Sequence, residues 1–328
     1  MLSYILRRLL AVVPMLIGIS LIVFFLTHLI PADPAREILG LKATDAAVAA
    51  KRHELGLDRS TLQQYVTWLQ HAVQGNLGHS WFHETESVAD QLRTRLPITF
   101  DMAFGALVFT IVVGLPLGLI AGTRPQGVAD RLITFGTSAG ISIPDFWLAM
   151  MLVVVLAVHH NWLPSVGYSS GPFDQIFYGY IWDSSANIGA WISHLTMVWI
   201  ALGVPGAASF ARQLRGAIID AMEQDYIRTA RAKGLRSRIV VLKHALKNAS
   251  MVPVTVLGLQ FAYLLGGTVV LERIFSIGGL GTYMLSALSA KDIPVVQAVT
   301  LLVALTFIVV NLCVDILYAY LNPKVRLG

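Results

Sequence analysis

Charged side chains are scarce in this chain of 328 residues. They make up 13% of it, whereas about a quarter of the residues in an ordinary soluble domain are charged. Hydrophobic residues make up 55%, and the mean hydropathy is +0.67. Because so few charges cannot cover a soluble protein of this size, we expect the chain to be embedded in a lipid bilayer.

Cysteine and the common catalytic motifs are also lacking. The single cysteine, Cys313, excludes an internal disulfide framework and a clustered thiolate metal site. No Gly-x-x-x-x-Gly-Lys-Ser/Thr sequence occurs, so the chain does not bind ATP through a P-loop, and no His-Glu-x-x-His zinc motif occurs. We therefore expect no enzymatic activity, cofactor or metal ion on this chain.

Six apolar stretches are long enough to cross a membrane as helices, which takes roughly 20 residues. They are Leu9–Ile30, Ile98–Gly122, Leu132–Val158, Ala190–Ala211, Ala249–Leu271 and Val295–Leu321. The first is longer than the apolar part of a secretory signal, so we expect it to be retained as an anchor. The sequence thus predicts an all-α, polytopic membrane protein with six transmembrane helices.

Lysine and arginine are distributed unevenly between the loops. Fifteen of the 24 lie at the two termini, after the second stretch or in segment 212–248, whereas loops 159–189 and 272–294 together carry only two. Because positively charged loops stay in the cytoplasm, we expect both termini to be cytoplasmic. The net charge of +5 follows from this asymmetry and requires no nucleic-acid partner.

These stretches divide the chain into three regions. Residues 1–30 hold the N-terminus and the first transmembrane helix, residues 31–97 form an extracytoplasmic segment, and residues 98–328 hold the core domain with the other five helices and the cytoplasmic loop 212–248. Spacing of apolar residues predicts two short helices in the extracytoplasmic segment, Asp45–Leu55 and Ser60–Gln74. The second is expected to have Ser60 as its N-cap.

Two pairs of histidines lie on the expected outer side, His79 with His83 and His159 with His160. Imidazole pairs are frequent metal ligands, but no carboxylate stands at matching spacing. An interfacial loop with aromatic anchors explains His159 and His160 better, and the turn chemistry around Gly78 weakens a metal site at His79 and His83.

Segment 212–248 carries nine basic and three acidic residues. Its apolar spacing predicts two helices separated by Gly234. Such a segment can lie on anionic lipid, or it can dock into a groove of a partner protein.

This segment resembles the cytoplasmic coupling loop of ATP-binding-cassette importer permeases of the dipeptide, oligopeptide and nickel family. The residues that carry the resemblance are Asp225-Tyr226-Ile227-Arg228-Thr229-Ala230-Arg231-Ala232-Lys233-Gly234-Leu235 and Leu242-Lys243-His244-Ala245-Leu246-Lys247-Asn248-Ala249. Shorter similarities extend along nearly the whole chain, among them Ile30-Pro31-Ala32-Asp33-Pro34, Gly75-Asn76-Leu77-Gly78, Ser142-Ile143-Pro144 and Asn322-Pro323-Lys324-Val325-Arg326. The likeness is greatest to the first permease of a dipeptide importer.

The resemblance implies a plasma-membrane complex. Its other parts would be a second, homologous permease that forms a heterodimer with this chain, two cytoplasmic subunits that bind ATP and magnesium, and an extracytoplasmic solute-binding protein. Dipeptides or oligopeptides would pass by alternating access between the two permeases. The residues expected to couple the chain to the ATPases are Asp225, Tyr226, Arg228, Thr229, Ala230, Lys233 and Gly234.

Ionisable groups at membrane depth are costly and usually face a cavity or a partner. Asp145 follows Pro144 inside the third stretch, so we expect it to line the pathway or a subunit interface. Gln260 in the fifth stretch is a further candidate. The outer loop 272–294 is either a flexible loop or a shaped gate, and its candidate residues are Gly278, Gly279 and Gly281.

Three other polar residues within the stretches have simpler explanations. Asn311 and Asp315 stand four residues apart, hence on one helix face, where structural hydrogen bonds are expected. Asp101 lies near the outer boundary, where contact with solvent would account for it.

Two alternatives to a peptide importer remain. Nickel or another small solute would fit the same family, with imidazoles as ligands for nickel. In other classes, the chain could be a stand-alone carrier or channel, or an intramembrane enzyme with Ser138 in a Gly-x-Ser-x-Gly sequence. A face of small residues for close helix packing explains that sequence better.

Overall fold

The computed structural model describes residues 2–28, 33–40, 42–83, 85–173, 187–266 and 268–321. The regular secondary structure of these ranges is helical, and strand pairing among them is limited to a single bridge between His79 and Ser87. The predicted all-α class is therefore confirmed for the described part of the chain.

Four helices are each long and apolar enough to cross a membrane on their own. They are α1 (Leu2–His28), α5 (Val88–Thr123), α9 (Ile188–Met222) and α16 (Ile293–Leu321). Each contains or largely overlaps one predicted stretch. The helices α5 and α9 extend beyond the apolar stretches, α5 by ten residues at its start and α9 by eleven at its end.

The third predicted stretch, Leu132–Val158, is sharply bent at Pro144. It is divided between α6 (Val128–Ser142) and α7 (Asp145–Leu152), which continues as the wider turns of η1 (Val153–His159), and the two parts meet at 97°. The cause is Pro144, which disfavours helical backbone in the residue before it. Ile143 is extended accordingly, with ψ at 123°.

The fifth predicted stretch, Ala249–Leu271, is also broken. Helix α13 (Met251–Gly266) covers most of it, and the separate short helix α14 (Val269–Ile274) begins within its last residues. Before α13 lie α11 (Ser237–Ile239), η2 (Val240–Ala245) and α12 (Leu246–Ala249), bent by 57° from α13. Counting each bent pair as one span gives six spans, and counting only unbroken helices gives four.

The centre of the fold is the contact between α5 and α9. Gly114, Gly118 and Gly122 recur every four residues along α5 and face α9. A Cβ on Gly118 would stand 2.9 Å from the carbonyl oxygen of Ala211, and one on Gly122 would stand 2.8 Å from the Cβ of Ile218. This stripe of glycines therefore brings the two backbones together, as in other closely packed membrane helices.

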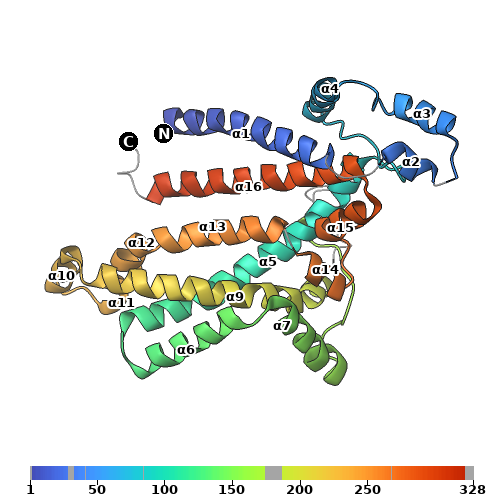
Figure 1. The fold of residues 1–328 in the computed structure, drawn as a ribbon. Helices are drawn as coiled ribbons and strands as arrows, with labels where there is room; N and C mark the ends of the chain where they lie inside the picture. Colours follow the sequence, from blue (N-terminus) through green and yellow to red (C-terminus); the bar gives the residue numbers. More distant parts are fainter. Residues whose placement is uncertain are drawn as a thin grey trace.

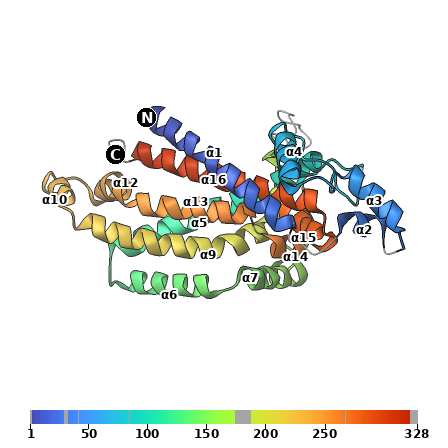
Figure 2. The ribbon, with the colours of Figure 1, turned by 45° about the horizontal axis from the view of Figure 1, so that its top comes forward.

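The short helices before α5 lie at one end of the bundle, as Figures 1 and 2 show. They are α2 (Pro34–Leu39), α3 (Asp45–Glu54) and α4 (Thr61–Val73). The two helices predicted in this segment are confirmed to within a residue at each end. Ser60 caps α4 as expected, in a capping box with Gln63.

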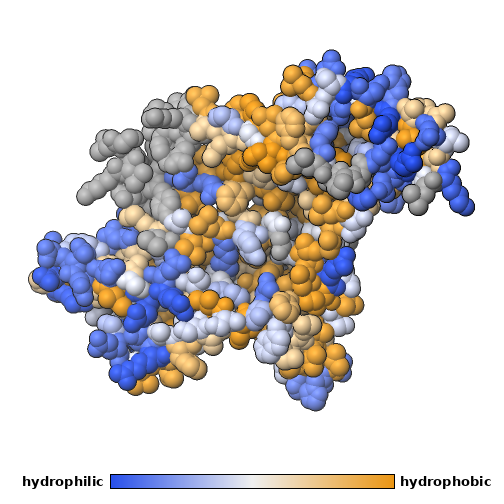
Figure 3. All heavy atoms as spheres, viewed as in Figure 1, coloured by the Kyte–Doolittle hydropathy of each residue, from blue (hydrophilic) through white to orange (hydrophobic). Residues whose placement is uncertain are grey.

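The opposite end of the bundle holds the start of α1, the end of α16 and the corner formed by α10 (Asp225–Ala232) and α11 (Figures 1 and 2). Hydrophilic residues gather at these two ends, and hydrophobic residues occupy much of the surface between them (Figure 3). The molecule thus has an apolar middle with a polar segment at each end, the arrangement expected of a chain that crosses a membrane.

Candidate coupling and transport sites

Helix α10 is anchored on one face. Ile227 and Ala230 are buried in an apolar cluster that α9 and the following turns complete, with Leu214, Ile218 and Val240 among its members. Because only this face carries large apolar contacts, the rest of the helix projects from the end of the bundle.

The exposed side of α10 carries most of the residues predicted for coupling: Asp225, Tyr226, Arg228, Thr229 and Lys233. Arg228 pairs with Asp225 one turn away at 3.3 Å, and both side chains are largely exposed. Ala230, also predicted for coupling, belongs instead to the buried face. The arrangement presents a short, charged helix surface on a rigid apolar base.

Gly234 ends this helix as the sequence predicts. Its φ is +74°, in the left-handed region that favours glycine. The amide of Leu235 donates to the carbonyl of Ala230 at 3.4 Å, and that of Gly234 donates to Arg231 at 2.9 Å. These bonds satisfy carbonyls at the helix end and turn the chain toward α11.

A hollow of about 520 Å³ lies where α7, α9 and α13 meet. Asp145 and Gln260, 115 positions apart in the sequence, both line it, so the structure brings together two of the predicted pathway residues. Tyr263 and Ser209 add hydroxyl groups to the lining. Pro144 sets the bend that places Asp145 there.

Gln260 also joins three helices. Its Nε2 donates to Oγ1 of Thr110 on α5 at 3.3 Å, and that hydroxyl donates to the carbonyl of Gly203 on α9 at 3.3 Å. Asp145 lies half-buried at the start of α7, where its carboxylate accepts the amide of Phe146 at 2.7 Å. The lining of the hollow therefore includes one amide fixed by its neighbours and one half-buried carboxylate.

The predicted glycine loop lies apart from this hollow, between α14 and α15 (Leu280–Ala290). Glu272 is fully buried and accepts hydrogen bonds from the amides of Gly281, at 3.1 Å, and Thr282, at 2.7 Å. A Cβ on Gly279 would stand 2.6 Å from the Glu272 carboxylate. Arg95 donates to the carbonyl of Gly278 at 3.3 Å. Of the two interpretations, this bonded turn fits a shaped element better than a flexible loop.

The predictions for the three remaining polar residues, Asn311, Asp315 and Asp101, differ in how they compare with the structure. Asn311 donates to the carbonyl of Phe307 at 3.0 Å, a bond within α16, and Asp315 is half-buried on the same helix. The expectation for Asp101 was wrong, because it is fully buried. The hydroxyl of Tyr168 donates to its carboxylate, and the indole of Trp199 donates to its carbonyl.

An ion pair between α6 and α9 was missed in the sequence. The guanidinium of Arg215 binds both oxygens of Asp130, at 2.5 and 2.8 Å, and Asp130 is only 3% exposed. The amide of Gln126, at 2.8 Å, and the hydroxyl of Thr134, at 3.3 Å, also donate to this carboxylate. The available signal was a lone acid at the start of one apolar stretch and an arginine just beyond the end of another.

The histidine pairs are surface features in the structure. The rings of His159 and His160 contact each other, and His160 stacks on Trp162 with ring centres 4.6 Å apart. Within the described ranges, no group of three histidine, cysteine or acidic side chains is placed to hold a metal ion. Ser138 lies inside α6, without the strand-to-helix turn that a nucleophile elbow requires.

Comparison with known protein families shows to which family the chain belongs. Residues 114–327 match the family described as "Binding-protein-dependent transport system inner membrane component", and residues 1–103 match the N-terminal family of such membrane components. The chain belongs to the inner membrane components of binding-protein-dependent transport systems. The resemblance seen in its coupling segment is therefore confirmed.

Individual relatives agree with the family. The chain is 38% identical over 326 residues to the "Glutathione transport system permease protein GsiC" of Escherichia coli strain K12, and likewise to that of Shigella flexneri serotype 5b, covering 99% of each protein. Its fold is similar to that of a chain in a structure of the MetNI methionine ABC transporter in an inward-facing conformation. The TM-score is 0.53 at 19% identity, covering 70% of this chain and 96% of that one.

This membership settles the general role of the chain. It is a multi-pass membrane permease subunit of an ATP-binding-cassette importer, and ATP hydrolysis belongs to partner ATPases.

Proposed function

We propose that this permease imports dipeptides or other short peptides, glutathione-like molecules included. The observation that carries the proposal is the 38% identity over nearly the full length to permeases named for glutathione transport, since glutathione is itself a short peptide. The proposed complex holds a second homologous permease, two cytoplasmic ATPases that bind ATP and magnesium, and an extracytoplasmic solute-binding protein. Both termini of this chain then lie in the cytoplasm.

In this proposal α10 receives the motion of an ATPase. Its buried residues, Ile227 and Ala230, fix it to α9, so that force applied to the exposed face moves α9 with it. Because α9 is packed along α5, the movement passes to the centre of the fold. Alternating access is then a rigid-body displacement of helices that ATPase closure biases.

The hollow of Asp145 and Gln260 is the proposed part of the solute pathway. The Asp145 carboxylate suits the ammonium group at the start of a peptide, and the fixed amide of Gln260 suits a peptide carbonyl. Ionisable residues at this depth most often serve a pathway or a partner.

The proposal is tested by uptake into proteoliposomes that hold the whole complex. Unlabelled dipeptides are expected to suppress uptake of a labelled dipeptide, and nickel ions are not. Suppression by nickel alone would favour the metal importer, and uptake without ATP would favour a stand-alone carrier.

A substitution tests the pathway residue in the same assay. Asp145→Asn is expected to lower uptake of a peptide with a free amino terminus about tenfold and to leave its N-acetylated form less affected, since only the former carries the charge. Unchanged uptake of both would remove Asp145 from the pathway.

A further inference from the structure

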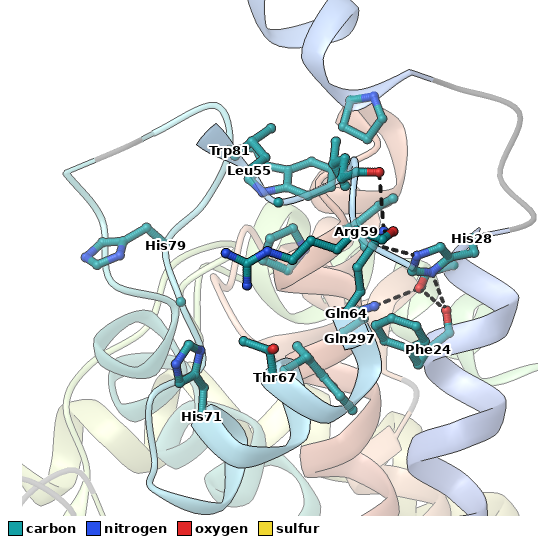
Figure 4. Close-up of a pocket in the computed structure, with 18 of the residues that line it drawn as sticks. Phe24, His28, Leu55, Arg59, Gln64, Thr67, His71, His79, Trp81 and Gln297 are labelled. Carbon is teal, nitrogen blue, oxygen red and sulfur yellow. Dashed lines mark hydrogen bonds between the residues drawn. The ribbon is translucent and has the colours of Figure 1, made fainter. Parts of the chain in front are cut away.

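A second large pocket lies at the other end of the bundle, away from the hollow of Asp145. It has a volume of about 730 Å³ and is formed by the last turn of α1, helix α4, the turn 76–81 and the first turn of α16 (Figure 4). This size is typical of sites for small organic ligands. Residues of the N-terminal family match provide most of its lining.

Part of the pocket wall is aromatic and apolar. Phe24 of α1, Trp68 of α4 and Trp81 of the following turn contribute rings, and Leu55 and Leu77 add aliphatic surface. The rings of Phe24 and Trp68 contact each other at 5.7 Å between centres, which holds that side in place. Such a wall suits the apolar part of a ligand.

Several polar side chains of the lining already form hydrogen bonds with one another or with the backbone. Gln297 donates to the hydroxyl of Thr27 at 2.8 Å, and the two ring nitrogens of His28 lie 2.9 Å from the carbonyl of Phe24 and 3.2 Å from Oε1 of Gln64. They therefore shape the pocket and leave other groups to meet a ligand.

Arg59 is the group that remains available. Its guanidinium points into the pocket, between Trp81 on one side and Thr67 and His71 on the other (Figure 4). Within the described ranges no carboxylate lies within 4 Å of it, and its side chain donates no hydrogen bond there. The lining imidazole of His79 likewise has no bonded partner among the described residues.

The lining acid does not offset this charge. Asp33 is the one acidic residue among the described lining residues, and Arg52 binds both of its oxygens, at 3.0 and 3.2 Å. Asp58, next to Arg59, accepts a hydrogen bond of 2.6 Å from His53, which holds the pKa of Asp58 below its ordinary value. Arg59 is therefore the lining cation without an ion pair in the described ranges; it is exposed, and the only carboxylate that feels its charge is that of the adjacent Asp58, outside the lining.

We propose that this pocket binds a small organic anion, with a carboxylate at Arg59 and an apolar part against Trp68 and Trp81. Arginine suits this role because its planar guanidinium matches a carboxylate in a two-point contact. The choice of a short peptide as the anion rests on the proposed function. The pocket is then an outer site where a peptide is held by its carboxyl terminus, separate from the hollow of Asp145.

The test measures binding to the whole complex in nanodiscs of phosphatidylcholine, without ATP, by calorimetry. The probes are dileucine and its C-terminal amide, which lacks the carboxylate. The native complex is expected to bind dileucine about tenfold more tightly than the amide, and Arg59→Gln is expected to remove that difference. Arg59→Lys, which keeps the charge without the planar fork, should give an intermediate affinity.

Arg93→Gln is the matched control, since Arg93 is an exposed arginine on the same side of the bundle, outside the pocket. It should leave dileucine binding unchanged. An affinity that Arg59→Gln does not alter, in a complex whose unfolding temperature is unchanged, would overturn the proposal. In nanodiscs that also contain phosphatidylglycerol, Arg59-dependent binding of that lipid with no dileucine binding would also overturn it, because the anion would then be a lipid headgroup.

Uptake by the same complex separates this inference from the proposed function. ATP-driven dileucine uptake together with Arg59-independent binding would refute the pocket alone. Arg59-dependent binding without any ATP-driven uptake of peptides would refute the proposed function and leave the pocket as an anion site.

Discussion

A Cβ placed on Gly206 of α9 would stand 1.7 Å from Nε2 of Gln260 on α13. The amide of Gln260 thus occupies the space that any other residue at position 206 would need. Since Gln260 also donates to Thr110 on α5, the absence of one side chain allows three helices to share a polar contact beside the hollow.

Gly206→Ala is expected to displace this amide. The substitution should destabilise the permease by about 1–3 kcal/mol, the usual cost of overpacking, and lower the rate of uptake. Gly216→Ala is the control on the same helix, because a Cβ there meets nothing within 4 Å. The midpoint of thermal unfolding should fall for the first variant only, and equal midpoints would contradict this packing.

Glu272→Ala is expected to remove the hydrogen-bond acceptor of two backbone amides at the start of α15. The amides of Gly281 and Thr282 would lose their acceptor in a buried place, at a cost of roughly 2–4 kcal/mol. Glu54→Ala, which removes an exposed carboxylate bound to Lys51, should have little effect. A loss of thermal stability confined to the first variant supports the account, and a loss of equal size in both would count against it.

Asp130→Asn is expected to weaken the contact between α6 and α9. It leaves the positive charge of Arg215 near the membrane without its buried partner, which should cost about 2–4 kcal/mol. Asp90→Asn breaks an exposed pair with Arg93 and should be nearly neutral. Unfolding of the purified complex in detergent measures both, and a neutral Asp130→Asn would show that the pair is dispensable.

Features with a local cause were predictable from the sequence. Ser60 and Gln63 stand at the spacing of a capping box, and α4 begins there. Gly234 interrupts two amphipathic runs, and the chain turns there with a positive φ. The apolar stretches predicted the positions of the long helices, because a backbone embedded in lipid must satisfy its polar groups within a helix.

Features that depend on distant residues were not predictable. In the sequence, Asp101 looks like a solvated residue at the membrane boundary. In the structure it is bonded to Tyr168 and Trp199, which lie 67 and 98 positions further along the chain. Hydropathy alone gave one continuous stretch through position 144, although Pro144 is itself a local signal for the bend of 97° found there. Hydropathy measures burial from water and contains no information on where a helix changes direction.

The central claim is that α10 couples ATP hydrolysis to transport, and Gly234→Asp in the reconstituted complex tests it most directly. A side chain at Gly234 is strained by the φ of +74°, but a Cβ there meets nothing within 4 Å, so the strain stays local and the complex should still assemble. Gly75→Asp is the matched control, with the same charge, a similar φ of +80° and equally open surroundings at the other end of the bundle.

The measurement is the number of peptides taken up per ATP hydrolysed. We predict that Gly234→Asp retains hydrolysis while uptake falls at least tenfold, and that Gly75→Asp keeps the native ratio. A native ratio in Gly234→Asp would contradict the account.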